Sequence, residues 1–390
     1  MRVRVVILVY LALFVGELSW SGVTPLIPSY IAKYGLTDFE GGLVLSVASL
    51  GILVASLPAS AITRRVSPRT LTLAAMVAIA LAGLAMSVAP GYFSIIAARF
   101  IFGLGFGTLW LSMAAWLDDA AGARSAQVLA MTTAIVGVSA MLAPAYAGWV
   151  AKHWGLSAPF VGLALVTFLL VVLLLFDRSG TGLRKDPAPP VRELARAMHA
   201  DPDLLTMLLL TVAIAVVWMT ADLLVPLRLD LGGYNVAAIG IAFSLSSIVF
   251  VVTSAITARG ADRWARPGIA AVSAAGLTLC TILPAIFVGV PVALLFLFGA
   301  GIATGVIAAL TFPFGLLAVK RGAVTVAVMT ALTNVVWALA GMAGPTVGGG
   351  FAEWAGDQAA FAVLASICLV VTVVVWRQTR TKAKKIRVVE

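Results

Sequence analysis

Residues 157–176 read SAPFVGLALVTFLLVVLLLF, a run without a charged side chain that ends at Asp177. An α-helix needs about 20 apolar residues to cross a bilayer. A membrane-spanning strand would be a ~10-residue segment of alternating polarity, whereas the apolar residues here are continuous. The stretch therefore predicts a transmembrane helix.

The whole chain shares the composition of this stretch. Of its 390 residues 62% are apolar and 11% are charged, against about 45–50% and ~25% in soluble domains. So much apolar surface excludes a disordered protein, a disulfide scaffold and a water-soluble enzyme. Cys280 and Cys368 fall within apolar segments, where a packed or lipid-facing residue is favoured over a disulfide.

Charges, prolines and glycines divide the chain into twelve predicted spans and one long polar stretch. The spans lie near 5–32, 40–63, 70–89, 93–116, 126–150 and 157–176, then near 204–228, 236–258, 268–288, 292–318, 323–349 and 358–376. We predict an all-α integral membrane protein with four parts: an N-terminal six-helix bundle (1–176), a cytoplasmic linker (177–203), a C-terminal six-helix bundle (204–377) and a basic cytoplasmic tail (378–390).

The positions of Lys and Arg predict the orientation. With a cytoplasmic N-terminus, all but four of the 26 Lys and Arg lie in the tails and the even-numbered turns. The exceptions are Lys33, Lys152 and Arg228 on the other side, and Arg99 within a span. Cytoplasmic loops retain positive charge, so we predict a multi-pass protein of the cell membrane with both termini cytoplasmic. The net charge of +10 then reflects topology and contact of the tail with anionic lipid, not a nucleic-acid partner.

One face of the linker is apolar. Val191, Leu194, Ala195 and Met198 share a helical face, and Arg192 lies away from it. This pattern indicates either a short helix on the inner membrane surface or a disordered linker.

The two sets of six spans repeat each other. PSYIAKYG from Pro28 compares with PLRLDLGG from Pro226, and RFIFGLGFG from Arg99 compares with LFLFGAGIATG from Leu295. APAYAG at 143–148 compares with GPTVGG at 344–349. Matching landmarks in the same order indicate two six-helix halves related by duplication, which is the architecture of transporters that rock between two states.

These residues resemble the major facilitator superfamily over essentially the whole chain. That family has a Gly-x-x-x-Asp-Arg-x-Gly-x-Arg-like turn after its second helix, often repeated after its eighth. The second copy here keeps Asp262, Arg263 and Arg266, whereas the first, SAITRRVSPR, has Arg64 in place of the acid. The fourth-helix signature is matched by Arg99, Gly103, Gly105 and Gly107. The resemblance implies two six-helix bundles related by a pseudo-two-fold axis, with a cavity lined by the first, fourth and seventh helices.

A Gly-Pro-x-x-Gly-Gly motif is typical of the fifth helix in proton-coupled exporters of that family. It is intact only in the eleventh span, and the fifth keeps two of its residues. Because Gly-Pro pairs free a carbonyl and glycines allow close approach, we expect a bend or a close helix contact at both places. The motif residues are Pro144, Gly148, Gly344, Pro345, Gly348 and Gly349.

The two basic turns predict a cytoplasmic gate. Asp262 can pair within its own turn or with the end of the tenth span, and Arg64 and Arg65 face Asp118 and Asp119. We interpret these as charge-swapped versions of one contact that breaks when the two halves rock. The alternative is that they are solvated charges whose positions reflect only the orientation of the chain in the membrane. The gate set is Arg64, Arg65, Asp118, Asp119, Asp262, Arg263, Arg266, Lys320 and Arg321.

Three charged residues lie clearly within spans, away from the span ends, and a charge at mid-bilayer costs at least ~2.5–3.5 kcal/mol. Glu17 shares a helical spacing with Ser21, Thr24 and Pro28, so we expect one polar face that lines the cavity. Arg99 is expected at the same depth as Asp222, and an ion pair between the two would form an outer gate. The alternative is an ion pair between Arg99 and Glu17, which lies deeper. The other interpretation is that all three are structural charges.

Both histidines, His153 and His199, lie outside the predicted spans, so proton coupling would need Glu17 or Asp222 as the carrier. Aromatic and amide side chains complete the expected substrate cavity, although Trp also marks membrane interfaces. The cavity set is Glu17, Trp20, Ser21, Thr24, Arg99, Trp110, Trp218, Asp222, Asn334 and Trp337.

No nucleotide-binding, zinc-protease or serine-hydrolase motif occurs, so we expect no enzyme activity, cofactor or metal. The sequence favours a monomeric secondary transporter that exports amphipathic organic compounds in exchange for protons. The alternative is a symporter or uniporter for an organic anion, with Arg99 holding the substrate charge. A channel or a membrane-embedded enzyme is the other class.

Overall fold

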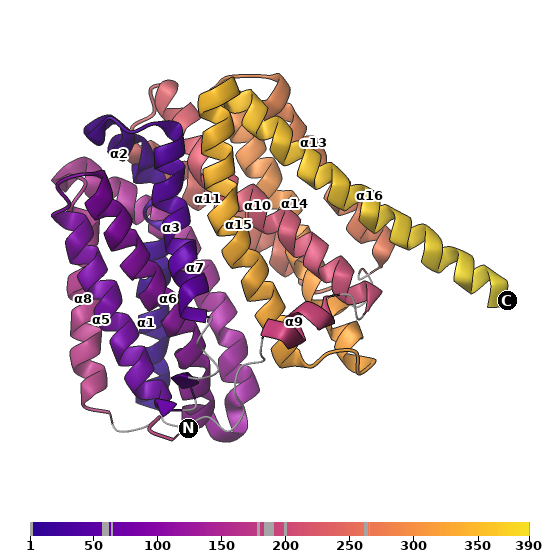
Figure 1. Cartoon of the computed structure of the whole chain (residues 1–390), viewed down its shortest axis with the longest axis horizontal. Helices are drawn as coiled ribbons and strands as arrows, with labels where there is room; N and C mark the ends of the chain where they lie inside the picture. The colour runs from indigo at the N-terminus through magenta and orange to yellow at the C-terminus, as the bar shows by residue number, and fades with distance from the viewer. Residues whose placement is uncertain are drawn as a thin grey trace. The chain divides into compact units, whose positions relative to one another are not determined.

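The computed structural model describes residues 3–56, 62–63, 65–177, 180–182, 191–198, 201–260, 264 and 266–389. All regular structure in these residues is helical, with no strand among them (Figure 1). Within the same residues, twelve helical segments are long and apolar enough to cross a membrane. The prediction of an all-α membrane protein with twelve spans is therefore confirmed.

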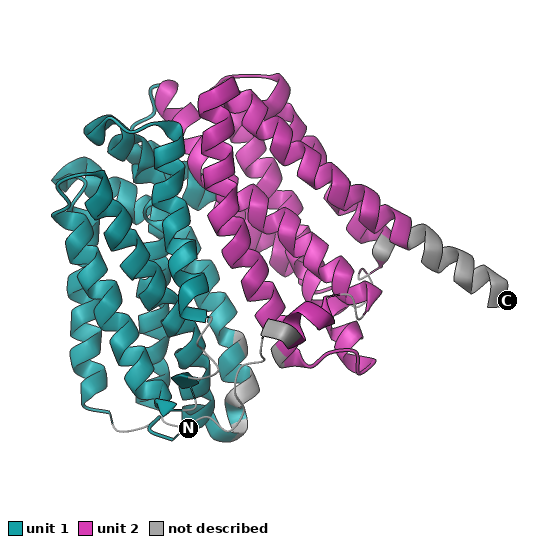
Figure 2. Ribbon diagram, in the orientation of Figure 1, with its two compact units in different colours: residues 1–188, 233–245 teal, residues 189–232, 246–390 magenta. Residues whose placement is uncertain are grey.

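The chain divides into two compact units (Figure 2). Residues 1–188 with 233–245 form unit 1, and residues 189–232 with 246–390 form unit 2. Helix α11 (Val236–Ala258) begins in unit 1 and ends in unit 2. The bundle boundaries expected from the sequence, at 176 and 204, stay predictions.

Unit 1 contains the helices of the first half. They are α1 (Val3–Ser21), α2 (Ile27–Tyr34), α3 (Asp38–Ser56), α5 (Pro68–Ser87), α6 (Tyr92–Ala121), α7 (Ser125–Trp154) and α8 (Ala158–Leu175), with 3-10 turns at Thr24–Leu26 and Gly122–Arg124. A buried apolar cluster from α1, α5, α6, α7 and α8 forms the core of the unit, with Trp116 fully buried in it.

Unit 2 contains the remaining helices. They are α9 (Val191–Ala197), α10 (Pro202–Leu231), most of α11, α13 (Pro267–Ile286), α14 (Val290–Lys320), α15 (Val326–Ala355) and α16 (Asp357–Val389). Proline in the first turn starts α10 and α13, where its missing N–H costs no hydrogen bond. Helix α16 continues beyond residue 376, the predicted end of the last span.

The first span is not one continuous helix. Helix α1 ends at Ser21, and α2 resumes at Ile27 after a 3-10 turn. Pro25 and Pro28 have no N–H, so the carbonyls of Ser21 and Thr24 cannot receive their regular helical bonds. The single polar face expected from residue 17 to residue 28 is therefore wrong, because only Glu17 and Ser21 share a helix.

The apolar face of the linker does form a helix. Helix α9 covers Val191–Ala197 and packs against α15 within unit 2. Ala197 is buried, whereas Met198 is exposed. A short helix is thus present at the predicted place, and its contact with a membrane surface stays a prediction.

Glycines bring the helices of each unit into backbone contact at matching positions. A Cβ added at Gly103 of α6 would lie 2.0 Å from the carbonyl oxygen of Ala48 in α3. Gly301 of α14, 198 residues later, faces Ser246 of α11, with its nearest contact at 3.1 Å. Ala48 and Ser246 are also 198 residues apart. The same helix pair is therefore packed through the same positions in both halves, as expected for a duplicated bundle.

The close contact at Gly103 should limit the stability of unit 1. We expect Gly103→Ala to lower the free energy of unfolding by about 1–3 kcal/mol, because overpacking forces the backbones of α3 and α6 apart. Thermal unfolding of the purified protein in detergent measures this. Gly276→Ala in α13 is the matched control, since a Cβ there meets no atom within 4 Å, and it should be neutral or stabilising. Equal unfolding temperatures for the two variants would contradict the packing account.

Candidate functional site

The buried acid of unit 1 is Glu17 on α1. It is 7% exposed, and its carboxylate accepts a hydrogen bond of 3.2 Å from the indole N–H of Trp110 on α6. Gly16 makes this contact possible, because a Cβ there would already lie 3.1 Å from Leu109. The two helices thus approach closely at the position where the acid meets the indole.

Glu17 has no ion-pair partner among the described residues. One neutral donor, Trp110, satisfies a carboxylate that is surrounded by the apolar core of unit 1. Burial of an ionised carboxylate without a cation is unfavourable, and the usual response is neutralisation by a proton. The site therefore holds a buried carboxyl group with one indole donor and no cation among the described residues.

An aromatic stack extends from Glu17 along α6. Trp20, almost one turn after Glu17, stacks on Phe106 with ring centroids 5.5 Å apart. Phe106 in turn stacks on Phe102 at 5.5 Å. Aromatic rings therefore lie next to the buried acid in the core of unit 1, where Phe102 and Phe106 are 4% and 5% exposed.

Arg99 lies beside this stack, against both Trp20 and Phe102. It is 2% exposed, and its Nε donates to the carbonyl of Val44 on α3 at 3.2 Å. Its guanidinium carbon lies 5.1 Å from the ring centre of Phe102 and 5.8 Å from that of Trp20. Cation–π contact of this kind stabilises a charge that has been removed from water.

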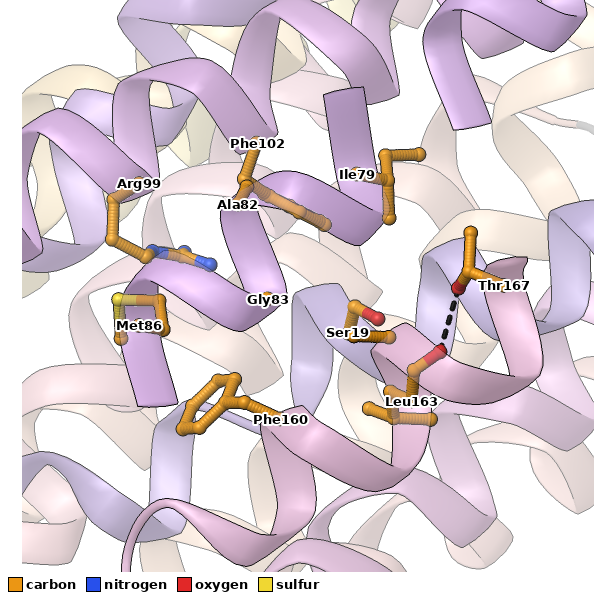
Figure 3. Close-up of a pocket in the computed structure, with 11 residues that line it drawn as sticks. Ser19, Ile79, Ala82, Gly83, Met86, Arg99, Phe102, Phe160, Leu163 and Thr167 are labelled. Carbon is orange, nitrogen blue, oxygen red and sulfur yellow. Dashed lines mark hydrogen bonds between the residues drawn. The ribbon is translucent and has the colours of Figure 1, made fainter. Parts of the chain in front are cut away.

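A small cavity of about 10 Å³ adjoins Arg99, in the space that it shares with Met86 and Phe160 (Figure 3). That volume is close to the minimum for one water molecule. Trp110 and Arg99 are separated by about 16 Å along α6, at ~1.5 Å per residue. Consistent with this distance, the part of the chain that the structure describes contains no ion pair between Glu17 and Arg99.

Unit 2 contains a polar contact at the position of the aromatic stack in unit 1. The indole N–H of Trp218 on α10 donates to the hydroxyl of Thr304 on α14 at 3.1 Å. Trp218 lies 198 residues after Trp20, and Thr304 lies 198 residues after Phe106. The first and fourth helices of each half are thus joined through a tryptophan at the same position. Sequence analysis missed Thr304, although the offset of the repeat could have identified it.

The remaining predicted cavity residues differ in their exposure. Asp222, half-buried, follows Trp218 by one turn of α10, and the predicted pairing of Arg99 with Asp222 stays a prediction. Asn334 is exposed on α15, and Trp337 is 36% exposed. Ser21 is half-buried and Thr24 is buried. Their contact with a substrate stays a prediction.

The gate residues of unit 1 bind the segment that follows α8. Asp119 accepts the backbone N–H of Gly180 at 3.2 Å. Arg69, which was not among the predicted residues, donates to the carbonyls of Leu175 and Asp177 and so caps the end of α8. The two predicted gate residues Arg65 and Asp118 are exposed. Arg64 lies outside the described residues.

In unit 2 the predicted gate residue Arg321 contacts the start of α10. Its guanidinium bonds Asp201 at 2.7 Å and also bonds Asp203. Asp201 and Asp203 were missed, although the sequence Asp-Pro-Asp at 201–203 is a typical helix start. Lys320 and Arg266 are exposed. Asp262 and Arg263 lie outside the described residues.

The proline-glycine motif of α7 forms a close helix contact within unit 1. A Cβ at Gly240 of α11 would lie 2.2 Å from the carbonyl oxygen of Pro144, and one at Gly148 would lie 2.4 Å from that of Val236. Ser244 accepts the N–H of Ala145 at 3.0 Å. The expected close contact is present, whereas α7 remains one continuous helix across Pro144.

The intact motif in α15 packs on α10 within unit 2. Gly344 and Gly348 lie against Thr220, and a Cβ at Gly348 would be 2.9 Å from its methyl carbon. Helix α15 is continuous through Pro345, and Gly349 is buried. This motif therefore also forms a close contact and leaves its helix unbroken.

The architecture is that of a membrane transporter with two helical units. Residues 9–341 match the family model of the Major Facilitator Superfamily. Because the match covers most of the chain, this protein belongs to the Major Facilitator Superfamily, and the predicted family and fold are confirmed. No curated protein sequence is a significant match.

Solved structures share the fold at low sequence identity. A bacterial homologue of the human lysosomal transporter Spinster, in an inward-facing and occupied conformation, has a TM-score of 0.83 at 12% identity, covering 97% of both chains. Its inward-facing, unoccupied form has a TM-score of 0.81 at 13% identity, covering 98% of both. A POT family transporter in complex with a thioalcohol-conjugated peptide has a TM-score of 0.74 at 15% identity, covering 97% of this chain and 96% of that one.

The contact between α10 and α14 can be tested through Arg321. We expect Arg321→Gln to lower the free energy of unfolding by about 1–3 kcal/mol, because it leaves the buried Asp203 without its cation. Lys320→Gln is the matched control, since this neighbouring side chain is exposed. Thermal unfolding of both variants gives the comparison. An equal, small effect in both would show that Arg321 is only a solvated charge.

Proposed function

We propose that this transporter exports small amphipathic organic compounds by alternating access, in exchange for protons that bind Glu17. The observation that supports the proposal is the environment of this carboxyl group. It lies inside a membrane-spanning helix, it is 7% exposed, and it has one neutral hydrogen-bond donor and no cation among the described residues.

Such a carboxyl group can couple a proton to a conformational change. A charge inside the membrane is costly, at least ~2.5–3.5 kcal/mol at the bilayer centre, so a closed state favours the protonated form and a water-filled state permits the ionised form. The donor Trp110 can serve both forms, because a protonated carboxyl group keeps acceptor capacity. Proton binding would therefore change the charge of the site while leaving its geometry in place.

The rings beside Glu17 support an amphipathic substrate. Trp20, Phe106 and Phe102 form a stacked apolar surface that begins almost one turn from the acid. A ligand with an apolar body could pack on these rings while its polar group approaches the carboxyl group. Trp218, at the equivalent position of unit 2, supplies one further aromatic ring, which is bonded to Thr304.

The contacts of Arg99 with α3 and with aromatic rings, rather than its burial, favour this proposal over an organic-anion carrier. Its Nε is bonded to the Val44 carbonyl, its charge lies over aromatic rings, and it is 2% exposed. These contacts fit an arginine that joins α6 to α3. A substrate anion would have to displace them to reach the guanidinium.

The gate and the membrane orientation belong to the same proposal. We place both termini in the cytoplasm of a cell whose inner membrane surface is anionic, with the basic turns and Asp118 and Asp119 at the inner end. The contact of Asp119 with Gly180 supports a closing role for this end, because it ties the segment after α8 to α6. The working unit is a single chain.

The test is transport by Glu17→Gln in proteoliposomes. A panel of radiolabelled organic solutes is first assayed with the unsubstituted protein, with and without an imposed pH gradient. For the solute that the unsubstituted protein transports, we expect Glu17→Gln to abolish gradient-driven transport, since an amide cannot carry the proton. Binding of that solute to the variant should survive. Asp230→Asn, an exposed acid at the end of α10, is the matched control and should transport normally.

Two results would contradict the proposal. Gradient-driven transport that survives Glu17→Gln would remove Glu17 as the proton carrier. Transport that is independent of the pH gradient in the unsubstituted protein would remove proton coupling altogether, and loss of binding in Arg99→Lys would then favour the organic-anion carrier.

A further inference from the structure

A groove in unit 2 is lined by residues of α15 and α16, together with Val216 and Thr220 of α10. Its free volume is about 90 Å³. The floor contains Gly344, Gly348 and Thr220, where the two glycines contribute no side chain. The glycine-proline motif that packs α15 on α10 therefore also leaves space for the groove, because its glycines have no side chain to fill it.

The rims of the groove are apolar side chains at the edge of the exposed surface. Val347 of α15 is 43% exposed, and Val363 and Ile367 of α16 are half-buried. Val370 follows Ile367 by almost one turn of α16 and is 62% exposed. The groove is thus continuous with an exposed apolar stripe on a helix that is long and apolar enough to cross the membrane.

We propose that this groove binds one alkyl chain of a bilayer lipid. Its wall is apolar except for Thr220, whose side chain faces Gly344 and Gly348. Its lining atoms can therefore make dispersion contacts with an apolar chain but offer almost no hydrogen-bond partner. An empty groove would also forfeit the dispersion contacts of its lining atoms.

The shape and surroundings of the groove point to an alkyl chain. Its lining on α15 extends from Ala343 to Phe351, or about 12 Å at ~1.5 Å per residue, which is the length of several methylene groups. Acyl chains are the molecules that surround the apolar faces of spanning helices, and their affinity for such surfaces grows with each buried methylene group. A polar solute would find a single hydroxyl group in the groove, that of Thr220.

Photo-crosslinking tests the proposal on the full chain. The protein is placed in nanodiscs that contain a phospholipid with a diazirine midway along one acyl chain, then irradiated, and the labelled positions are mapped by mass spectrometry. We expect labelling at Val347, Val363 and Ile367 to exceed labelling at Val370, although Val370 is more exposed than Val347. Acyl chains that are held in the groove stay near its rim residues and label them. Labelling by bulk lipid instead increases with the exposure of each side chain.

Filling the groove should remove the excess of labelling at its rim residues over labelling at Val370. We expect Val363→Phe to reduce labelling at Val347 and Ile367 at least about fourfold, the factor for one buried methylene group. Val370→Phe is the matched control, because it adds the same bulk on the same helix outside the groove. If Val363→Phe does not fold, Ala343→Leu narrows the groove from the α15 side and serves the same purpose.

Three outcomes would overturn the proposal. Labelling that follows exposure alone, with Val370 above the rim residues, would mean that no chain is held. Equal labelling of the rim residues in the groove-filling and control variants would also mean that no chain is held in the groove. An unlabelled groove beside a labelled Val370 would mean that another part of the protein covers it. None of these measurements depends on transport, so the proposal stands or falls separately from proton-coupled export.

Discussion

A polar side chain inside a bilayer must be satisfied by the protein itself, and this constraint orders the interior of each unit. Glu17 has the indole of Trp110, Arg99 has the Val44 carbonyl and aromatic rings, and Trp218 has Thr304. In each case the hydrogen-bond partner lies on another helix of the same unit. Polar contacts therefore fix which helices are neighbours, while the apolar residues supply most of the buried surface.

Close helix packing makes these contacts possible. Gly16 brings α1 to within reach of Trp110, and Gly103 brings α3 and α6 into backbone contact. The equivalent contact at Gly301, 198 residues later, shows that the duplication kept the packing positions. The polar groups changed between the halves: unit 1 has stacked rings and a buried acid where unit 2 has a tryptophan–threonine bond. The two units thus share the positions at which their helices pack and differ in the polar side chains between those helices. This difference allows two similar units to have different roles in the proposed transport cycle.

The sequence was sufficient for the twelve spans, because apolar run length and the position of charges are local properties. It could not predict the partners, because Glu17 and Trp110 are 93 residues apart and Arg321 and Asp201 are 120 apart. Helical periodicity identifies the face of one helix and not the helix that packs on it. The break after Ser21 was missed for another reason, since the polar spacing was assumed to continue through Pro25 and Pro28. The repeat carried more information than we expected, as the equivalence of Trp20 and Trp218 shows.

Proton exchange at Glu17, within the membrane-spanning part of the chain, is the step on which the proposed transport cycle depends. Infrared difference spectroscopy of the reconstituted protein tests it directly, because protonated and ionised carboxyl groups absorb at different frequencies. The account predicts a protonated-carboxyl band that exchanges with a carboxylate band as the pH is changed, and that is absent from Glu17→Gln. An identical set of pH-dependent carboxyl bands in Glu17→Gln and the unsubstituted protein would contradict it.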